Sequence, residues 1–460
     1  MEGLEIKEKK LYEVLSNKDF RIDSSFYTKE PKKNPDLIYA KIGEHLISSQ
    51  YGISIEMNTD SVGYPIYRMN EIHDMLCDLD ADKYANITQA DYNKFALKDG
   101  DVLFNRTNSY EWVGRTGIYY QNDDIQRTFA SYLVRLNPKE SILPEYLCAY
   151  LNCKYGEWDI KRRARQSINQ TNVNPEEVKE IEIPVLNIDL QRKIQECFTR
   201  ANTLRVLSKT TYSEAELILH KELDIDLSTM VNTTITQKRF SDFVNSGRLD
   251  AEYYQPKYDD LFSRLGKFET KRLGEIVRIR KSIEPGSDAY QNKGIPFMRV
   301  SNLSKFGFSD TEIHLSPDEY KDVMRPLQNT ILLSKDGSVG IAYKVEQDMD
   351  AITSGAILHL TITDDEFMPD YLTLVLNSVI VGMQAERDAG GSIIQHWKLS
   401  EIENVIIPKL SQEIQQEITN KVRESFALRN ESKRLLNLAK TAVETAIEQG
   451  ENAAMNLLNI

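Results

Sequence analysis

The 460-residue sequence lacks the cysteine, histidine and apolar patterns of secreted, metal-binding or membrane-spanning proteins. Its four cysteines form no Cys-x-x-Cys pair and are Cys77, Cys148, Cys153 and Cys197. We therefore expect no disulfide frame and no zinc site, as in a protein of the reducing cytoplasm. The first residues lack the basic and apolar regions of a signal peptide. The longest apolar stretch, residues 371–383, is interrupted by Asn377 and Ser378 and is too short to cross a bilayer, so we expect a core helix there.

The sequence also lacks the motifs of motor, methyl-transferring and DNA-cutting enzymes. It has no Gly-x-x-x-x-Gly-Lys-Ser/Thr loop, which excludes the usual ATP-driven motor. It has neither the Asn-Pro-Pro-Tyr/Phe signature of adenine methyltransferases nor a glycine-rich methyl-donor loop after a strand. Residues 317–321 (Pro-Asp-Glu-Tyr-Lys) mimic part of a metal-dependent nuclease site, but their carboxylates are adjacent and would not sit on two strands around one metal. We therefore expect no catalytic residue in this chain.

The dominant feature that is present is an internal duplication. Short segments of the first half recur in the same order in the second half, at a near-constant offset of about 224 to 231 residues. The matched pairs are 21–27 with 248–254, 143–147 with 368–372, 151–152 with 376–377, and 181–184 with 405–408. One match could arise by chance, whereas several in one order indicate a tandem duplication. Since the chain is longer than one core usually supports, we expect two globular units.

Each copy ends in a segment with heptad spacing. In the first copy, apolar or small residues alternate at steps of four and three, at Leu190, Ile194, Cys197, Ala201, Leu204, Ser208, Thr211, Ala215 and Ile218. The second copy repeats this spacing 224 residues later, with one lysine, at Ile414, Ile418, Lys421, Ser425, Leu428, Ser432, Leu435, Ala439 and Ala442. Heptads sustained over about four repeats predict a pair of coiled-coil helices. The alternative is two unrelated amphipathic helices on separate cores.

The net charge of −13 is confined to the globular parts of the chain. Residues 185–225 carry six basic and six acidic residues, and residues 409–460 carry seven of each, so both helical segments are neutral. Residues 1–184 carry 24 basic and 30 acidic residues, and residues 226–408 carry 20 and 27. Acidic units are unusual for a DNA-binding protein, because phosphate contacts normally supply much of the affinity. Binding would have to be local, with a partner supplying part of the electrostatic attraction.

Local polar and basic segments supply candidates for such contacts. Four runs predict strands of mixed α/β units, namely 101–104, 117–120, 330–333 and 357–360. The turns at 105–109 and 334–338 hold a basic residue among short polar side chains, and residues 161–172 join a basic cluster to amide and hydroxyl groups. The candidate DNA-binding residues are Arg106, Asn108, Arg115, Arg162, Arg163, Arg165, Gln170, Arg278, Arg280, Lys281, Lys335, Ser338, Gln395, His396 and Lys398. The alternatives are a plain hairpin turn at Asp336-Gly337 and solvated basic surfaces elsewhere.

The ends of both copies resemble one known family. Residues 166–174, 178–184 and 190–194 are similar to the end of a target-recognition domain and the start of its spacer helix in the specificity subunits of type I restriction–modification systems. The second copy repeats the pattern at 391–395, 402–408 and 414–418. The resemblance covers essentially the whole chain, in the order domain, helix, domain, helix.

The resemblance implies an α+β fold of two homologous target-recognition domains, residues 1–184 and 231–408. Their spacer helices, residues 185–230 and 409–460, would pair as an antiparallel coiled coil about a pseudo-two-fold axis. Such a chain would read the two halves of an asymmetric double-stranded DNA site, with no catalytic residue or metal of its own. Its partners would be two methyltransferase subunits and the restriction–translocase subunits. These partners would hold the S-adenosylmethionine, Mg²⁺ and ATP.

Two other classes of function stay open. One is a single-chain restriction enzyme or methyltransferase with fused recognition domains, against which the missing motifs argue. The other is a coiled-coil scaffold that binds only protein. Binding to duplex DNA would separate a DNA reader from a scaffold, and activity of the pure chain with DNA and methyl donor would reveal an enzyme.

Overall fold

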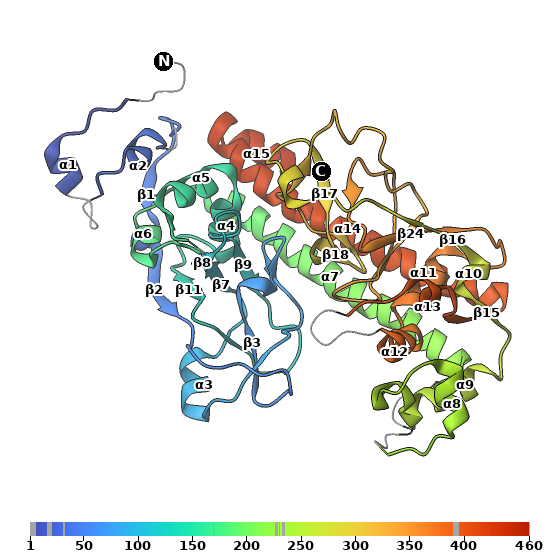
Figure 1. The fold of residues 1–460 in the computed structure, drawn as a ribbon. Coiled ribbons are helices and arrows are strands. Elements are labelled where there is room, and N and C mark those ends of the chain that lie inside the picture. The colour runs from blue at the N-terminus through green and yellow to red at the C-terminus, as the bar shows by residue number, and fades with distance from the viewer. Residues whose placement is uncertain are drawn as a thin grey trace. The chain divides into compact units, whose positions relative to one another are not determined.

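The computed structural model describes residues 6–15, 21–30, 33–168, 170–225, 229, 231, 235–389 and 395–459. The chain divides into two compact units. Unit 1 comprises Met1–Leu207 and Leu428–Ile460, and unit 2 comprises Ser208–Ala427. Two long helices, α7 (Ile188–Glu222) and α14 (Gln412–Gln449), contribute segments to both units (Figure 1). The two compact units meet within these helices, whereas the sequence predicts domain boundaries at the helix ends, at residues 184, 230 and 408. The expected boundaries therefore stay predictions.

Unit 1 is built around a six-stranded, mostly antiparallel sheet. Its strand order is β2 (Leu46–Tyr51), β11 (Leu133–Pro138), β7 (Asp101–Asn105), β9 (Thr116–Tyr119), β5 (Leu76–Cys77) and β4 (Ile72–His73). The helix α4 (Pro144–Asn152) packs against β7 and β9 (Figure 1). Val102 and Phe104 face the core that α4 covers, whereas Leu103 faces a second core with Tyr67 and Phe129. Strand β7 therefore has an unbroken apolar run, because both of its faces are buried.

Smaller elements complete unit 1. One further sheet contains β10 (Thr128–Phe129), β3 (Tyr64–Tyr67) and β6 (Tyr84–Ala85) in that order. A second sheet is the pair of β1 (Tyr39–Lys41) and β14 (Glu182–Pro184). A third sheet is β12 (Arg165–Gln166), β13 (Thr171–Asn172) and β8 (Thr107–Asn108). The remaining helices are α1 (Leu11–Leu15), α2 (Ser24–Thr28), α3 (Gln89–Phe95), α5 (Lys154–Arg163), α6 (Pro175–Lys179) and α15 (Glu451–Leu458).

Unit 2 repeats this plan with a smaller central sheet. Its antiparallel order is β16 (Val277–Lys281), β24 (Ile357–Ile362), β21 (Ile331–Ser334) and β22 (Ala342–Lys344), with α11 (Pro369–Asn377) packed on β22. The smaller sheets are β20 (His314–Leu315) with β17 (Ile295–Met298) and β23 (Ile352–Thr353), β18 (Leu303–Ser304) with β19 (Gly307–Phe308), and β15 (Thr270–Arg272) with β25 (Ile406–Pro408). The remaining helices are α8 (Phe240–Ser246), α9 (Pro256–Leu265), α10 (Leu273–Ile276), α12 (Val379–Asp388) and α13 (Leu399–Glu403).

The duplicated sequence segments make the same hydrogen bonds in each unit. The hydroxyl of Tyr146 donates to the carbonyl of Pro184, and that of Tyr371 donates to Pro408 at 2.7 Å. In each unit a matching glutamine also accepts a hydrogen bond from the backbone N–H of the residue that precedes the helix carrying this tyrosine. Gln191 accepts from Leu143 N at 2.9 Å and Gln415 accepts from Met368 N at 3.0 Å. The duplication therefore extends to individual side-chain contacts.

The apolar stretch at 371–383 does not form the single core helix that we expected. It spans the end of α11 and the start of α12, which are separated by the buried Ser378. The Ser378 hydroxyl donates to the carbonyl of Val375 at 2.7 Å, satisfying a group at the end of α11. Within the described residues, no helix is long and apolar enough to cross a membrane.

The two long helices pair in antiparallel fashion within each unit, as the heptads predict. In unit 1, Ser432 donates to the carbonyl of Ala201 at 2.7 Å, and Asn187 N donates to Glu451, just beyond α14. In unit 2, the hydroxyls of Ser208 and Ser425 donate to each other's backbone carbonyls at 2.8 and 2.7 Å. Rising numbers on α7 thus meet falling numbers on α14, and the predicted fold class is confirmed.

Most of the predicted seam is buried, and its apolar members Leu204, Ile218, Ile414 and Leu428 are half-buried. All of its Ala and Ser members lie below 4% exposure, because small side chains allow close approach of the helix backbones. Lys421 departs from the pattern and forms an ion pair with Glu214 at 2.7 Å. Its neighbour Val422, 4% exposed, occupies the buried position instead.

Candidate nucleic-acid interface

In unit 1 the first candidate segment follows the central strand β7. Asn105 ends this strand fully buried, and its amide donates to the carbonyl of Trp112 at 3.3 Å, which holds the following turn. Arg106 is half-buried, and its guanidinium lies 5.1 Å from the ring centroid of Tyr51 at the end of β2. Cation–π contact of this kind orients an arginine while its polar edge stays available for hydrogen bonds. Tyr51 was not among the candidates, because its contact with Arg106 depends on the strand register.

The second candidate segment lies beside the first, although about 60 residues of chain separate them. Strand β13 pairs with β8, with Thr171 opposite Asn108 and Asn172 opposite Thr107. Strand β12 extends the sheet, with Arg165 opposite Asn172. Arg165 and Gln170 are exposed and Asn108 is half-buried. The structure therefore places Asn108 and Arg165 in one small sheet at the end of β7, with Arg106 and Gln170 directly adjoining its strands β8 and β13.

Unit 2 has a corresponding site after β21. Ser334 is fully buried and its hydroxyl donates to the carbonyl of Ser338 at 2.6 Å, closing the turn that carries Lys335. Gly337 lies in this turn with φ of +76°, a conformation that favours glycine. Ser338 is exposed. The hairpin-turn interpretation of Asp336-Gly337 is therefore compatible with a contact function for its neighbours.

The turn after β21 is joined by the segment that begins at Gln395. Gly337 N donates to the carbonyl of Gln395 at 2.9 Å, and Trp397 N donates to the carbonyl of Lys335 at 2.8 Å. Trp397 is 1% exposed and anchors the segment, while Gln395, His396 and Lys398 are exposed. Residues 391–394, which carry part of the family resemblance, lie outside the described residues.

At the site in unit 2, one carboxylate, that of Asp336, contacts two basic side chains. Asp336 is paired with Lys335, and its Oδ1 lies 2.8 Å from Nδ1 of His396. Burial opposes ionisation of Asp336, but the hydrogen bonds from Lys335 and His396 outweigh it and lower the pKa of this carboxyl below its usual value. An ionised Asp336 holds Lys335 and His396 in one orientation, as a scaffold for polar contacts.

The basic residues of β16 occupy one exposed edge of the central sheet of unit 2. Arg278, Arg280 and Lys281 are exposed, and the intervening Ile279 packs towards the core. The register places Lys281 opposite Leu358, near the end of the sheet where Ser334 pairs with Ile357. Lys281 therefore lies at the same end as Lys335, whereas Arg278, opposite Thr361, lies towards the other end.

Two arginines of the basic cluster are placed inside unit 1. Arg163 is 6% exposed, and its guanidinium is paired with Asp159 at 3.1 Å and with Glu177 at 2.7 Å. Arg162 is paired with Asp159 and donates to the carbonyl of Phe26 at 2.8 Å. These placements argue against DNA contact by Arg162 and Arg163, because their charges are already satisfied by buried partners.

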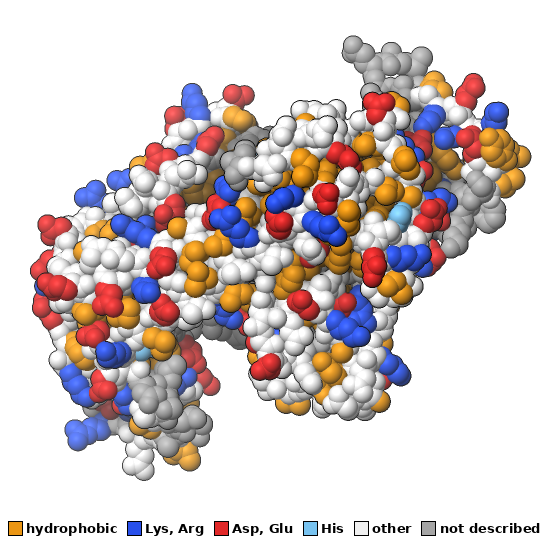
Figure 2. Space-filling model, turned by 180° about the vertical axis from the view of Figure 1, so that it is seen from behind, with side chains coloured by type: hydrophobic (Ala, Val, Ile, Leu, Met, Phe, Trp, Pro, Cys, Tyr) orange, Lys and Arg blue, Asp and Glu red, His pale blue; other side chains and the backbone are white. Residues whose placement is uncertain are grey.

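The surface contains charges of both signs close together. Figure 2 shows basic and acidic side chains interspersed over the face in view. The candidate Arg115 stacks on the ring of Trp112, and Lys398 is paired with Glu401 at 3.4 Å. Among the described residues, no group of three or more His, Cys, Asp or Glu side chains is arranged to hold a metal ion. The chemistry that these sites offer is hydrogen bonding and local charge.

Comparison with known families identifies the family of the chain. The model of the type I restriction modification DNA specificity domain matches residues 15–216 and matches again at residues 266–436. The chain belongs to this specificity family. The two matches together cover more than half of the chain. The first match contains the candidate site of unit 1, and the second contains that of unit 2.

Individual relatives carry the same family name. The MjaX protein of Methanocaldococcus jannaschii, assigned as a type I restriction enzyme specificity subunit, is 30% identical over 145 residues, which are 31% of this chain and 34% of that protein. The EcoKI specificity subunit of Escherichia coli K12 is 23% identical over 158 residues, 33% of this chain and 34% of that protein. The aligned part thus spans about a third of these relatives. The solved S subunit of a type I restriction–modification system from M. genitalium is 14% identical, covers 93% of this chain and 98% of its own, and has a TM-score of 0.36.

Proposed function

We propose that this specificity-family chain is the DNA-reading subunit of a type I restriction–modification complex. Unit 1 would read one half of a bipartite, asymmetric site in double-stranded DNA, and unit 2 would read the other half. The chain would also position two methyltransferase subunits and the restriction–translocase subunits. The observation that carries the proposal is the double match to the specificity domain, at residues 15–216 and 266–436.

The equivalent placement of the two candidate sites supports the proposal. Each site follows a central strand, β7 or β21, whose last residue is buried and holds the turn. Each site is joined by a segment that lies about 60 residues later in the chain. Two equivalent sites with different side chains suit a reader of two different half-sequences, because amide, guanidinium and hydroxyl groups discriminate base edges in the major groove.

The acidic character of the chain is explained if partners supply part of the attraction for DNA. The net charge of −13 disfavours non-specific attraction to phosphates. Methyltransferase subunits that clamp the DNA would add the missing phosphate contacts. Within the proposal, S-adenosylmethionine, Mg²⁺ and ATP bind to those partner subunits, and this chain contributes base recognition without a catalytic step.

A binding selection tests the proposal directly. The chain, assembled with the methyltransferase subunits of its own system, is mixed with a library of randomised duplex DNA, and the retained sequences are read. We expect one motif of two short defined blocks separated by a fixed gap. Retention without any sequence preference would contradict the proposal. Transfer of methyl groups by the pure chain would favour the single-chain enzyme instead.

Point variants test the placement of the sites. Arg165→Ala removes an exposed candidate in unit 1, and Lys335→Ala removes a half-buried candidate in unit 2. A residue that contacts a base should relax one block of the motif by about 1–3 kcal/mol, whereas a residue that contacts phosphate should weaken binding to all sequences equally. Arg192→Ala is the matched control, because this arginine lies exposed on α7, paired with Asp189 at 3.4 Å, and belongs to neither set of candidate residues. It should leave both blocks unchanged.

A further inference from the structure

Each unit contains a duplicated segment that is tied to the helix preceding its candidate site. In unit 1 this segment is residues 21–30, and in unit 2 it is residues 248–257; we call each of them a strap. The straps contain the sequence match between 21–27 and 248–254. The helix in question is α5 in unit 1 and α12 in unit 2.

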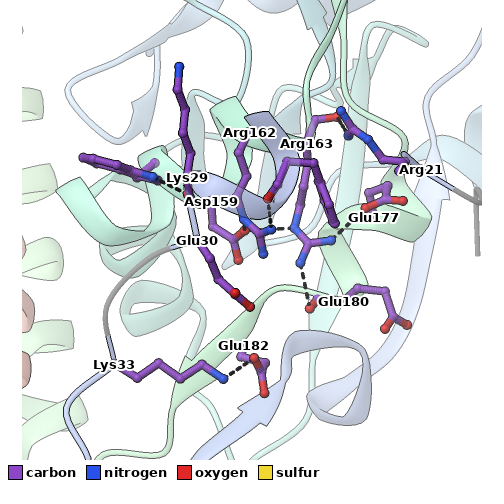
Figure 3. A network of polar contacts seen from close by, with 12 residues as sticks. Arg21, Lys29, Glu30, Lys33, Asp159, Arg162, Arg163, Glu177, Glu180 and Glu182 are labelled. Atoms are coloured by element: carbon purple, nitrogen blue, oxygen red, sulfur yellow. Dashed lines mark hydrogen bonds and ion pairs between the residues drawn. The ribbon is translucent and has the colours of Figure 1, made fainter. Parts of the chain in front are cut away.

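In unit 1 the strap is fastened by one arginine. Nη1 of Arg21 donates to the carbonyl of Arg163 at 2.9 Å (Figure 3). Nε and Nη2 of the same guanidinium donate to the two carboxylate oxygens of Asp23 at 2.8 Å. Arg163 is the last residue of α5, where backbone carbonyls have no partner within the helix. The hydroxyl of Tyr27 donates to the carbonyl of Arg21 at 2.7 Å and closes the strap on itself. A cation at this end of a helix is also favoured by the helix dipole.

An aromatic ring reinforces this attachment. Phe26 is 6% exposed, and its centroid lies 4.6 Å from the guanidinium of Arg21 and 4.5 Å from that of Arg162. The ring is therefore held between a strap arginine and an arginine of α5. This arrangement accounts for the buried position of Arg162, which the sequence had suggested as a DNA contact.

Unit 2 repeats the attachment with equivalent residues. Nη1 of Arg248 donates to the carbonyl of Asp388, the last residue of α12, at 3.0 Å. The same guanidinium binds Asp250 through two hydrogen bonds of 2.6 Å, and Tyr254 donates to the carbonyl of Arg248 at 2.8 Å. The ring of Tyr253 lies 4.9 Å from Arg248 and 5.0 Å from Arg387, as Phe26 does in unit 1.

The point of attachment in unit 1 lies directly beside the candidate base-contacting strands. Strand β12 begins at Arg165, two residues after the carbonyl that Arg21 holds. The side chain of Arg163 reaches across to Glu177 of α6 at 2.7 Å and to the carbonyl of Glu180 at 3.3 Å, beyond β13 (Figure 3). Arg163 therefore ties the chain before β12 to the chain after β13. The strap and Arg163 together hold both ends of the β12–β13 pair.

The geometry points to the straps as positioning elements that determine base discrimination, each for the half-site read by its own unit. Arg21 and Arg248 are the positioning residues, and they act through the ends of α5 and α12 without touching DNA. This inference rests on the proposed function. Base readout requires placement of the contacting groups to within a few tenths of an ångström, so a loosened helix end lowers discrimination even where all contacting side chains remain.

The experiment compares Arg21→Ala with Arg248→Ala in the full chain, assembled with its methyltransferase subunits and presented with a randomised duplex library. We expect each variant to relax one block of the motif, by about fivefold or more at each base pair, and the two variants to relax different blocks. Tyr27→Phe removes the closing hydrogen bond, and Tyr254→Phe removes it together with the hydrogen bond between Tyr254 and Ser246; both variants should act on the same blocks more weakly. If an alanine variant does not fold, the Tyr→Phe variant of the same unit still shows whether the strap affects base discrimination.

The controls separate positioning from general stability. Lys33→Ala removes an ion pair with Glu182 in the same unit, in which both side chains are 42% exposed, and it should leave both blocks unchanged. An Arg21 variant that selects the wild-type motif, or that relaxes both blocks equally, would overturn the inference. If the wild-type complex selects no motif at all, the proposed function itself fails, which is a distinguishable result.

Discussion

Lengthening both long helices by one heptad tests whether they set the gap between two half-sites. A copy of residues 205–211 is inserted after Leu204, and a copy of residues 422–428 is inserted after Leu428. The two insertion points face each other, because Ala201 meets Ser432 and Ser208 meets Ser425. The copied segments also reproduce the level at which two serines exchange hydrogen bonds. The seam therefore continues without interruption through the insertion.

The size of the effect follows from helix geometry. Seven residues at about 1.5 Å each lengthen the pair by about 10 Å. This length corresponds to roughly three base pairs at about 3.4 Å each. Three base pairs also rotate one half-site about the DNA axis by more than a quarter of a turn, since B-DNA has about 10.5 base pairs per turn. We therefore expect a preferred gap about three base pairs longer, with weaker methylation where the rotation misaligns the partner subunits.

The assay is the binding selection on a library with a randomised gap length, since binding can survive where methylation is lost. Both blocks of the motif should keep their sequences, because neither site is altered. An unchanged preferred gap in a well-folded double insertion would refute the idea that the helices set the spacing. Insertion into one helix alone is the control, and it should destabilise the chain because facing serines no longer meet.

Three further predictions concern stability and assembly. Ser425→Ala should lower the free energy of unfolding by about 0.5–1.5 kcal/mol, since it removes the hydrogen bond to Ser208 O at 2.7 Å; an unchanged thermal midpoint would contradict this. Burial lowers the pKa of His359 to about 4 from 6.5, so the unfolded chain binds a proton between these values that the folded chain does not. Stability should therefore fall as the pH falls from about 6.5 towards 4, by about 1.4 kcal/mol per pH unit, and His359→Gln should flatten this slope in urea titrations at several pH values. A fragment of residues 1–230 should pair with a second copy through its own long helix and, with the methyltransferase, modify a palindromic site; a folded but strictly monomeric fragment would count against this.

Local and periodic patterns in the sequence were sufficient to predict two equivalent units and a pair of long helices. The heptad seam repeats every seven residues, so the helix pairing could be predicted without knowledge of the rest of the fold. The duplicated short segments predicted two equivalent units, and their tyrosines and glutamines make equivalent hydrogen bonds. The long apolar stretch at 371–383 was interpreted wrongly as one helix, because a buried serine that satisfies the end of α11 looks like an ordinary interruption.

The candidate sites depended on information that the sequence does not contain locally. Arg163 and Arg165 stand two positions apart in one basic cluster, yet one is buried against Glu177 and the other is exposed on β12. Which arginine turns inwards is decided by a carboxylate from α6 and by the strap that arrives from residue 21. In the same way, Asp336 meets His396 only through the pairing of segments 60 residues apart. Repeating patterns along the chain therefore determined the family and the helices, whereas long-range pairing decided which polar groups lie at the surface.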